Sequence, residues 1–116
     1  MSADYVDWPG QSGATYRYAF TNINDCYAVP ANYTFVRKLP NGNWLPLYFG
    51  EAGDLNQRGM PRHERLAEAV KLGMTHFMTH RASASQETRR AEEADLIQRW
   101  NPPLNTHHRM TQQPYG

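Results

Sequence analysis

The sequence predicts an α+β protein in which a small three-stranded antiparallel sheet is flanked by helices. Aromatic, alternating segments occupy the first half of the chain, an Asn-Gly step separates two of them, and a helical pattern with capping residues fills the second half. The 116 residues suit one domain. We expect this domain to span 14–105, after an irregular lead-in at 1–13 and before a flexible C-terminal tail at 106–116.

Three segments are predicted as β-strands, and the first of them alternates and is rich in aromatic residues. The polar stretch 21–31 connects the first two, and residues 40–43 form a hairpin signal because Asn-Gly accepts the positive φ angles of a tight turn. Pro46 lacks a backbone donor, so the third strand is expected at a sheet edge or to begin only at Leu47. The three segments are 14–20, 32–39 and 44–52.

The hydrophobic period changes to that of a helix after the third strand. Residues 53–73 predict a helix capped by Asp54, with its main part starting near Pro61 because proline is tolerated in a first helical turn. Residues 74–80 have the alternation of a short strand. Residues 83–100 form the clearest helical segment, with Ser83 and Gln86 at the spacing of a capping box, and the Asn-Pro-Pro step after it ends the helix.

Composition restricts the classes of protein to consider. Charged residues make up 20% of the chain and no apolar run reaches the ~20 residues of a membrane helix, so a cytoplasmic protein without a membrane partner is expected. Cys26 is the only cysteine, which excludes an internal disulfide and favours a core position. The net charge is only +1, but residues 55–90 hold seven Lys/Arg against three Asp/Glu, a balance that suits either a polyanion or a solvated helix face.

One carboxylate is in an unexpected place. On a helical wheel Glu93 shares its face with Leu96, Ile97 and Trp100, and burying a charge without a partner costs several kcal/mol. The helical pattern by itself favours an ion pair of Glu93 with Arg58, Arg89 or Arg90, or a position at the edge of the sheet from which the carboxylate reaches water. Elsewhere Tyr33 and Tyr48 lie in consecutive predicted strands, where each is an ordinary aromatic residue by itself, and the sheet is able to bring their phenols together.

In combination, these residues resemble the GIY-YIG nuclease domain. Residues 31–33 (Ala-Asn-Tyr) correspond to the first signature triplet, although only the tyrosine is kept, and residues 48–50 (Tyr-Phe-Gly) correspond to the second. Arg58 follows the last glycine by eight residues, as the arginine does in many members of the family. The resemblance covers residues 33–105.

The second half of the chain carries the rest of the resemblance. Glu93 opens the Glu-Ala-Asp-Leu-Ile stretch, which fits the E-x-[DN]-L-I pattern, and Asn105 follows Glu93 by twelve residues. Gly-Met-Thr-His at 73–76 is similar to a Gly-x-Thr-His stretch of small bacterial relatives. Glu51 beside the second triplet and Gly59 after the arginine depart from the pattern, but no core side chain is lost.

The resemblance implies a set of catalytic roles. Tyr33 would accept a proton from the attacking water, Tyr48 would hydrogen-bond to the phosphate or the water, and Glu93 would bind one Mg²⁺ or Mn²⁺ ion. Arg58 would bind the phosphate as a fixed fork of donors. Asn105 would hold the end of the last helix against the site, and His63 would be a second phosphate or base contact.

The function expected from the resemblance is that of a divalent-metal-dependent endonuclease, a hydrolase of DNA phosphodiester bonds, with RNA left open as a substrate. The alternative is a nuclease-like module of weak or no activity that binds nucleic acid or a protein partner. The altered first triplet favours this alternative weakly, and the retention of Tyr33, Arg58 and Glu93 argues against it. Specificity is left to the loops, a homodimer or a separate targeting partner.

Overall fold

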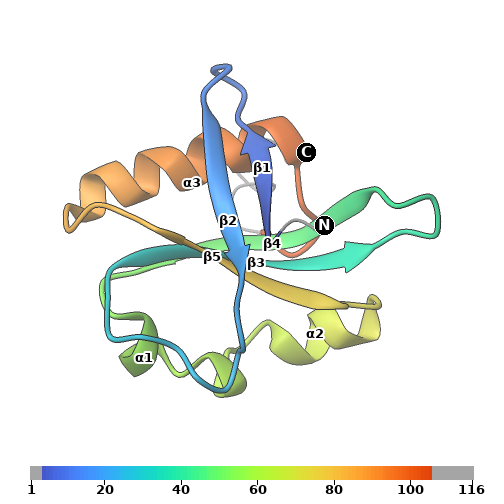
Figure 1. Ribbon diagram of the computed structural model, residues 1–116, viewed down its shortest axis with the longest axis horizontal. Helices are drawn as coiled ribbons and strands as arrows, with labels where there is room; N and C mark the ends of the chain where they lie inside the picture. Colours follow the sequence, from blue (N-terminus) through green and yellow to red (C-terminus); the bar gives the residue numbers. More distant parts are fainter. Residues whose placement is uncertain (1–3, 106–116) are drawn as a thin grey trace, which may run out of the picture.

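The sheet of this protein has five strands. In the computed structural model, which describes residues 4–105, they form one antiparallel sheet in the order β1–β2–β5–β3–β4 (Figure 1). The prediction of a three-stranded sheet is therefore wrong; the predicted tail at 106–116 lies outside the described residues. The strands are β1 (Tyr5–Pro9), β2 (Thr15–Phe20), β3 (Ala31–Lys38), β4 (Trp44–Ala52) and β5 (His76–Arg81).

The first additional strand comes from residues expected to be an irregular lead-in. β1 pairs with β2 from Tyr5 opposite Ala19 to Pro9 opposite Thr15, and Trp8 points inward with 2% exposure. Because β1 is an edge strand, Pro9 at its end is tolerated without a ladder donor. The second addition, β5, is the segment read as a short strand, and it lies between β2 and β3 in the middle of the sheet.

The predicted hairpin joins β3 to β4 and places β4 at the other edge. Gly42 takes a φ of 88° in its turn, which is the conformation that the Asn-Gly step was expected to supply. The register shifts between Phe35 and Val36, because Phe35 pairs with Tyr48 and Val36 pairs with Pro46. This bulge accommodates Pro46 inside the strand and sets which β4 side chains face each side of the sheet.

Short helical segments follow β4. Asp54 caps the first of them, as expected, because its Oδ1 accepts a hydrogen bond of 3.0 Å from the backbone of Gln57. The main helix does not begin near Pro61, since His63 is extended with φ −60° and ψ 136° and separates the segments. Their bounds are α1 (Leu55–Arg58), a 3₁₀ turn η1 (Met60–Arg62) and α2 (Leu66–Lys71).

The long helix α3 (Gln86–Trp100) closes the fold. Its N-cap is Ser85, whose hydroxyl accepts from the backbone of Thr88, and not Ser83, which instead accepts from the backbone of Ser85. None of the helices within residues 4–105 is long and apolar enough to cross a bilayer.

Helices cover both faces of the sheet and produce two apolar cores (Figure 1). α1, η1 and α2 lie on one face, where Leu55, Met60 and Ala69 pack against Phe35. α3 lies on the other face, where Leu96 and Ile97 pack on a second cluster. That second cluster consists of Trp8, Tyr18, Val36, Phe49 and Met78. The edge strand β4 therefore runs between α1 and α3, and the space beside it is open to side chains from both.

Candidate active site

The predicted catalytic residues meet at one cavity. Tyr33 of β3, Tyr48 of β4, Arg58 of α1 and Glu93 of α3 line a space of about 570 Å³ beside the edge strand. Four separate elements thus contribute, and residues up to 60 positions apart in the chain line the same cavity. The remaining lining residues are Glu51, Arg90 and Ala94.

Gly50 lets the Tyr33 phenol cross the neighbouring strand. Tyr33 pairs with Gly50 in the β3–β4 ladder, so both point to the same face of the sheet. A Cβ atom at position 50 would lie 2.4 Å from Cζ and 2.5 Å from the hydroxyl oxygen of Tyr33. Any side chain at position 50 would displace the phenol of Tyr33. This explains physically why the second triplet ends in a glycine.

His63 holds the phenol from the other side. Its Nε2 lies 2.8 Å from the Tyr33 hydroxyl, and its Nδ1 accepts a hydrogen bond of 3.0 Å from the backbone of Arg65. Burial, and then the charge of Arg58, lowers the pKa of His63 to about 4, so the ring is neutral near pH 7. A neutral ring that accepts at Nδ1 carries its hydrogen on Nε2. His63 therefore donates to Tyr33, and the hydrogen of the phenol is free to point elsewhere.

Arg58 is fixed by a carboxylate that the sequence did not single out. Its Nη2 lies 2.8 Å and 3.0 Å from the two carboxylate oxygens of Glu64. The hydrogen bond with Arg58 is the main cause that lowers the pKa of Glu64 to about 2. Glu64 is exposed, and its carboxylate occupies guanidinium donors of Arg58 beside the cavity.

Glu93 has no hydrogen bond or ion pair with any residue in the range 4–105. The ion-pair explanation for its position is not realised, because Arg89 lies 2.9 Å from Glu51, Arg90 lies 3.6 Å from Glu51, and Arg58 binds Glu64. Burial first, and then the negative charge of Glu51, raises the pKa of Glu93 to about 7. The charge of Arg90 opposes this rise in pKa, but the half-buried carboxylate makes no ion pair within residues 4–105 and lines the cavity.

Asn105 and His63 are internal supports in this structure. The Asn105 side chain accepts from the backbone N–H of Phe49 at 2.9 Å and donates to the carbonyl of the same residue at 2.8 Å. The oxygen and the nitrogen of the Asn105 side-chain amide are thus both hydrogen-bonded inside the protein, and Asn105 is 0% exposed. His63 is 4% exposed, with both ring nitrogens occupied. The geometry gives these residues the tasks of holding β4 and Tyr33, and offers neither of them to a substrate.

The two phenols are weak acids in this surrounding. Burial is the main cause that raises the pKa of Tyr33 and of Tyr48, and the charge of Glu93 adds to it for both. Arg58 acts in the opposite direction on each phenol. Their rings lie 6.2 Å apart. Positive charge brought into the cavity would therefore lower both pKa values toward the range in which a tyrosine acts as a base.

The donor set fits a Mg²⁺ or Mn²⁺ ion that keeps most of its water. Within the described part of the chain, no three His, Cys, Asp or Glu side chains come together as a metal cluster. A magnesium site commonly uses only one or two carboxylates beside water and substrate phosphate. Glu93 provides one carboxylate without a cationic partner among residues 4–105, and the cavity of about 570 Å³ has room for water and a phosphate.

Two contributors were not foreseen from the sequence. Glu51 was noted only as a departure from the triplet pattern, and it binds Arg89, a residue with a side chain only 5% exposed. Glu64 lies six positions after Arg58, and side chains at this spacing do not face each other in a regular helix. Here the turn at Gly59 brings them together. Comparison with protein-family models, curated proteins and solved structures gives no match for this chain.

Proposed function

We propose that this protein is a divalent-metal-dependent endonuclease of GIY-YIG type that hydrolyses DNA phosphodiester bonds. One observation supports it above the others. Glu93, a carboxylate that makes no ion pair within residues 4–105, shares a cavity with two phenols and an arginine. A phosphodiester needs an aligned water, neutralised phosphate oxygens and help for the leaving oxygen, and these side chains provide groups for each need.

The proton of the attacking water goes to Tyr33. The phenolate form of Tyr33 is stabilised by the hydrogen bond from His63 Nε2 and by the nearby charge of Arg58. In this role His63 is a positioning residue, because its hydrogen already lies on the nitrogen that faces the phenol and it has no free site to take a second proton from Tyr33. Tyr48 hydrogen-bonds to the water or to a phosphate oxygen.

Arg58 and Glu93 act on the phosphate. Arg58 exchanges the Glu64 carboxylate for two phosphate oxygens, a bidentate contact that suits a planar guanidinium. Glu93 holds the divalent ion, which supplies Lewis acidity to the phosphate when bound. The supporting residues fix this geometry: Asn105 holds the backbone at Phe49, and Gly50 leaves space for the phenol.

The direct test is cleavage of plasmid, branched DNA and RNA in Mg²⁺ or Mn²⁺, with EDTA as the metal-free control. We expect metal-dependent nicking by the wild-type protein. Tyr33→Phe and Glu93→Gln should each lose at least about 100-fold in rate, the size typical of removing a general base or an electrostatic group. Circular dichroism and thermal unfolding should show that both variants still fold.

Matched controls come from the same elements. Glu87→Gln changes an exposed carboxylate in the first turn of α3, and Tyr5→Phe removes a hydroxyl on β1, far from the cavity in sequence and sheet order. Both should cleave like the wild type. Full activity of either cavity variant would refute the assigned roles. Salt-sensitive DNA binding without any cleavage would instead establish the binding module that is the alternative.

A further inference from the structure

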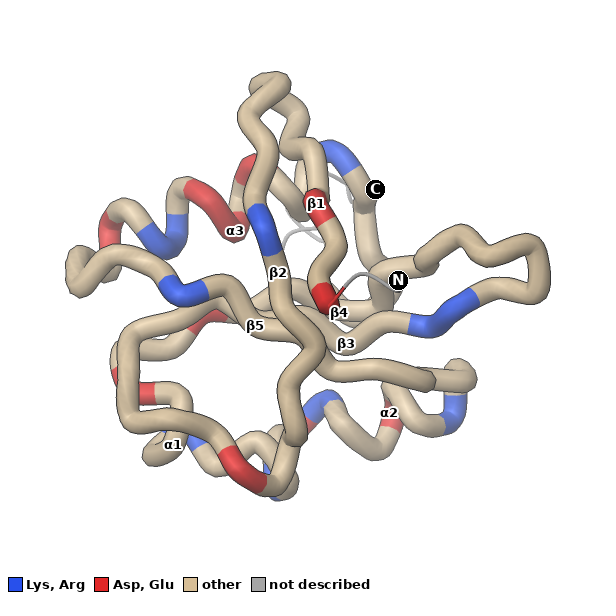
Figure 2. Tube along the Cα trace, viewed as in Figure 1, with Lys and Arg blue, Asp and Glu red and all other residues tan. Residues whose placement is uncertain are grey.

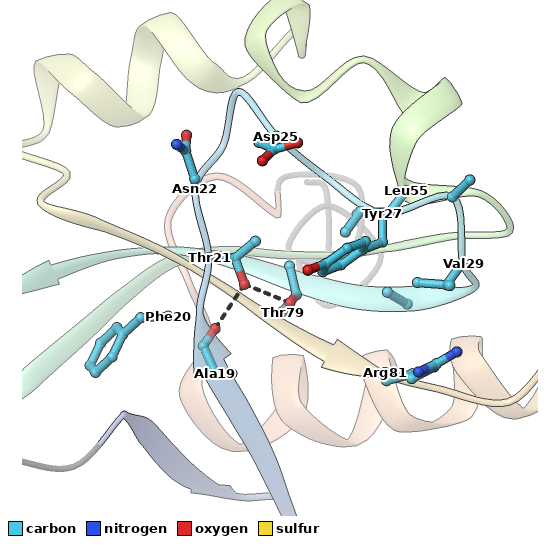
Figure 3. A pocket seen from close by; sticks show the side chains of 12 residues that line it. Ala19, Phe20, Thr21, Asn22, Asp25, Tyr27, Val29, Leu55, Thr79 and Arg81 are labelled. Atoms are coloured by element: carbon cyan, nitrogen blue, oxygen red, sulfur yellow. Dashed lines mark hydrogen bonds between the residues drawn. The ribbon is translucent and has the colours of Figure 1, made fainter.

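A second cavity lies on the sheet face that carries Tyr33, between the sheet and the loop that joins β2 to β3 (Figure 3). Its volume of about 650 Å³ falls in the ~300–1,000 Å³ range of small-molecule sites. Twelve residues line it, and the polar and aromatic ones among them are Thr21, Asn22, Asp25, Tyr27, Thr79 and Arg81. None of these residues belongs to the candidate active site.

The structural elements around this cavity also contact the elements that carry the candidate active site. Thr79 pairs with Tyr33 in the β3–β5 ladder, so the two side chains point to the same face. The loop is bonded to α1, because Leu55 donates its backbone N–H to the Val29 carbonyl at 2.9 Å and Asn56 donates a side-chain hydrogen bond of 3.0 Å to the Cys26 carbonyl. Since α1 also carries Arg58, this helix joins the loop of the second cavity to the candidate active site.

Tyr27 offers an aromatic surface at the mouth of this cavity. It is 80% exposed, more than any other large hydrophobic residue among those described. Figure 3 shows its ring directed toward the strand that carries Thr79, whereas Phe20 points away from the centre of the cavity. An exposed ring beside a cavity is costly to leave in water and is well suited to stack on a nucleobase.

The polar groups around Tyr27 match the edge of a base. Thr21 donates its single hydroxyl hydrogen to the Ala19 carbonyl at 3.1 Å, so the 2.7 Å contact between Thr21 and Thr79 uses the hydrogen of Thr79. The Thr79 oxygen is left as an acceptor beside the cavity. The Asp25 carboxylate accepts no hydrogen bond from residues 4–105, and it is a second acceptor for the amino or imino groups of a base.

Arg81 provides the cation at one end of the cavity. It is exposed at the end of β5, opposite Ala31, and its side chain makes no ion pair or hydrogen bond within residues 4–105. Most other arginines of the basic segment 55–90 are engaged by carboxylates, among them Arg58, Arg65 and Arg89. An arginine without such a partner beside an aromatic cavity is suited to the phosphate of a nucleotide.

We propose that this cavity binds one unpaired nucleotide of the substrate strand, with the base on Tyr27 and the adjoining phosphate on Arg81. The inference rests on the proposed nuclease function for its choice of a DNA strand, and it names the substrate class: DNA with an unpaired segment close to the cut. A base inside a duplex must first be unstacked at a cost of a few kcal/mol, which favours substrates in which it is already free.

Binding without cleavage tests the inference. A single-stranded oligodeoxynucleotide that carries one 5-iododeoxyuridine is titrated against the wild-type protein in EDTA and followed by fluorescence anisotropy, then photocrosslinked and mapped by mass spectrometry. The crosslink should map to Tyr27. Tyr27→Ala should weaken binding roughly 5- to 100-fold, the effect of losing one stacked base, and Tyr27→Phe should bind normally. Arg81→Gln should reduce the slope of log affinity against log salt by about 0.7.

The controls separate this site from the active site. Tyr5→Ala removes an exposed tyrosine of β1 and should leave binding unchanged. A fully paired duplex of the same sequence should crosslink far less. Equal crosslinking of the duplex, or unchanged binding by Tyr27→Ala, would overturn the inference even if cleavage depends on Glu93. Conversely, Glu93→Gln that cleaves like the wild type would defeat the nuclease mechanism while the Tyr27 crosslink still stood.

Discussion

Glu93 carries its carboxylate where burial and a second carboxylate, Glu51, both oppose ionisation. The pKa rises from 4.5 to about 7, so the folded protein holds a proton that the unfolded chain has already released between these pH values. Stability from this group is full below about pH 4.5 and is lost as the pH rises through 7. At pH 8 the ionised side chain of Glu93 therefore lowers the stability of the metal-free protein.

Glu93→Gln should therefore stabilise the metal-free protein at pH 8 while it abolishes cleavage. A shift of about 2.5 pH units corresponds to at most about 3 kcal/mol, and we expect a gain of about 1–3 kcal/mol in the free energy of unfolding. Urea unfolding in EDTA at pH 4 and pH 8 measures it, and the gain should vanish at pH 4. Glu87→Gln, at an exposed position, is the control; a variant that is less stable than wild type at pH 8 would contradict the argument.

The residues of the active site differ in how well the sequence predicted them. Tyr33, Tyr48, Arg58 and Glu93 were predicted from motifs and spacing, and they line one cavity. The contact between His63 and Tyr33 was not predicted, because it spans 30 positions and depends on the extended backbone at residue 63. A long-range contact of this kind leaves no periodic signal in a single sequence.

At the scale of elements, the β1–β2 hairpin is locked onto α3 by Asp95. Its carboxylate accepts from the Ser12 backbone at 2.8 Å, from the Ser12 hydroxyl at 2.7 Å and from the Tyr16 hydroxyl at 2.7 Å. A Cβ atom at Gly10 would lie 2.0 Å from Asp95 Oδ2, so the close approach also requires a glycine. Glu93 lies on the same helix, so these contacts help to hold the helix that carries it against the sheet.

Asp95→Ala should loosen the hairpin from the helix. Hydrogen bonds to a charged acceptor are worth about 1.5–3 kcal/mol in favourable cases, and with partial exposure we expect the free energy of unfolding to fall by about 1–3 kcal/mol. Burial first, and then Asp95, raises the pKa of Tyr16 to about 12, so the variant should also titrate this phenol at lower pH by ultraviolet absorbance. Asp7→Ala, which removes an exposed ion pair with Arg17 on the same hairpin, should change stability little.

The hairpin also shows where element prediction from the sequence fails. β2, β3 and β4 were predicted close to their observed bounds because each is rich in aromatic and β-branched residues and turn signals flank them. β1 has five residues and ends in Trp-Pro-Gly, so local signals favoured a loop, and only pairing with β2 makes it a strand. The start of the main helix was placed at Pro61 for a similar reason, since the local preference of proline was overridden by the extended turn at His63.

At the scale of the whole molecule, folding redistributes the charge that the sequence groups together. The basic excess of residues 55–90 suited either a polyanion or a solvated helix face, and Figure 2 shows blue and red segments interspersed over the fold. Arg89 and Arg90 lie close to Glu51, which comes from the acidic first half of the chain. Arg58 and Arg65 pair with Glu64 and Glu68. The pairs with Glu51 were not visible in the sequence because they depend on which strands and helices become neighbours, whereas Arg65–Glu68 is a local i,i+3 pair.

The salt dependence of DNA binding should reflect this pairing. Contacts from all seven Lys/Arg of the basic segment would give a slope of about −6 for log affinity against log salt on duplex DNA. Within residues 4–105, Arg62, Lys71 and Arg81 make no ion pair with a carboxylate. Under the proposed function Arg58 would exchange Glu64 for phosphate, so we expect a slope of about −2 to −4. Anisotropy titrations with Glu93→Gln in EDTA, from low to moderate salt, measure it.

Glu64→Gln tests more directly how the ion pair of Arg58 affects DNA binding. It frees Arg58 from a competing carboxylate, so it should raise DNA affinity severalfold while it changes the slope by no more than about one, because no new cation is added. Glu87→Gln removes the same formal charge from an exposed site on α3 and should raise affinity less. If both variants gain equally, the effect comes from net charge alone; a wild-type slope near −6 would show that the ion pairs open on binding and that the whole basic segment reaches the DNA.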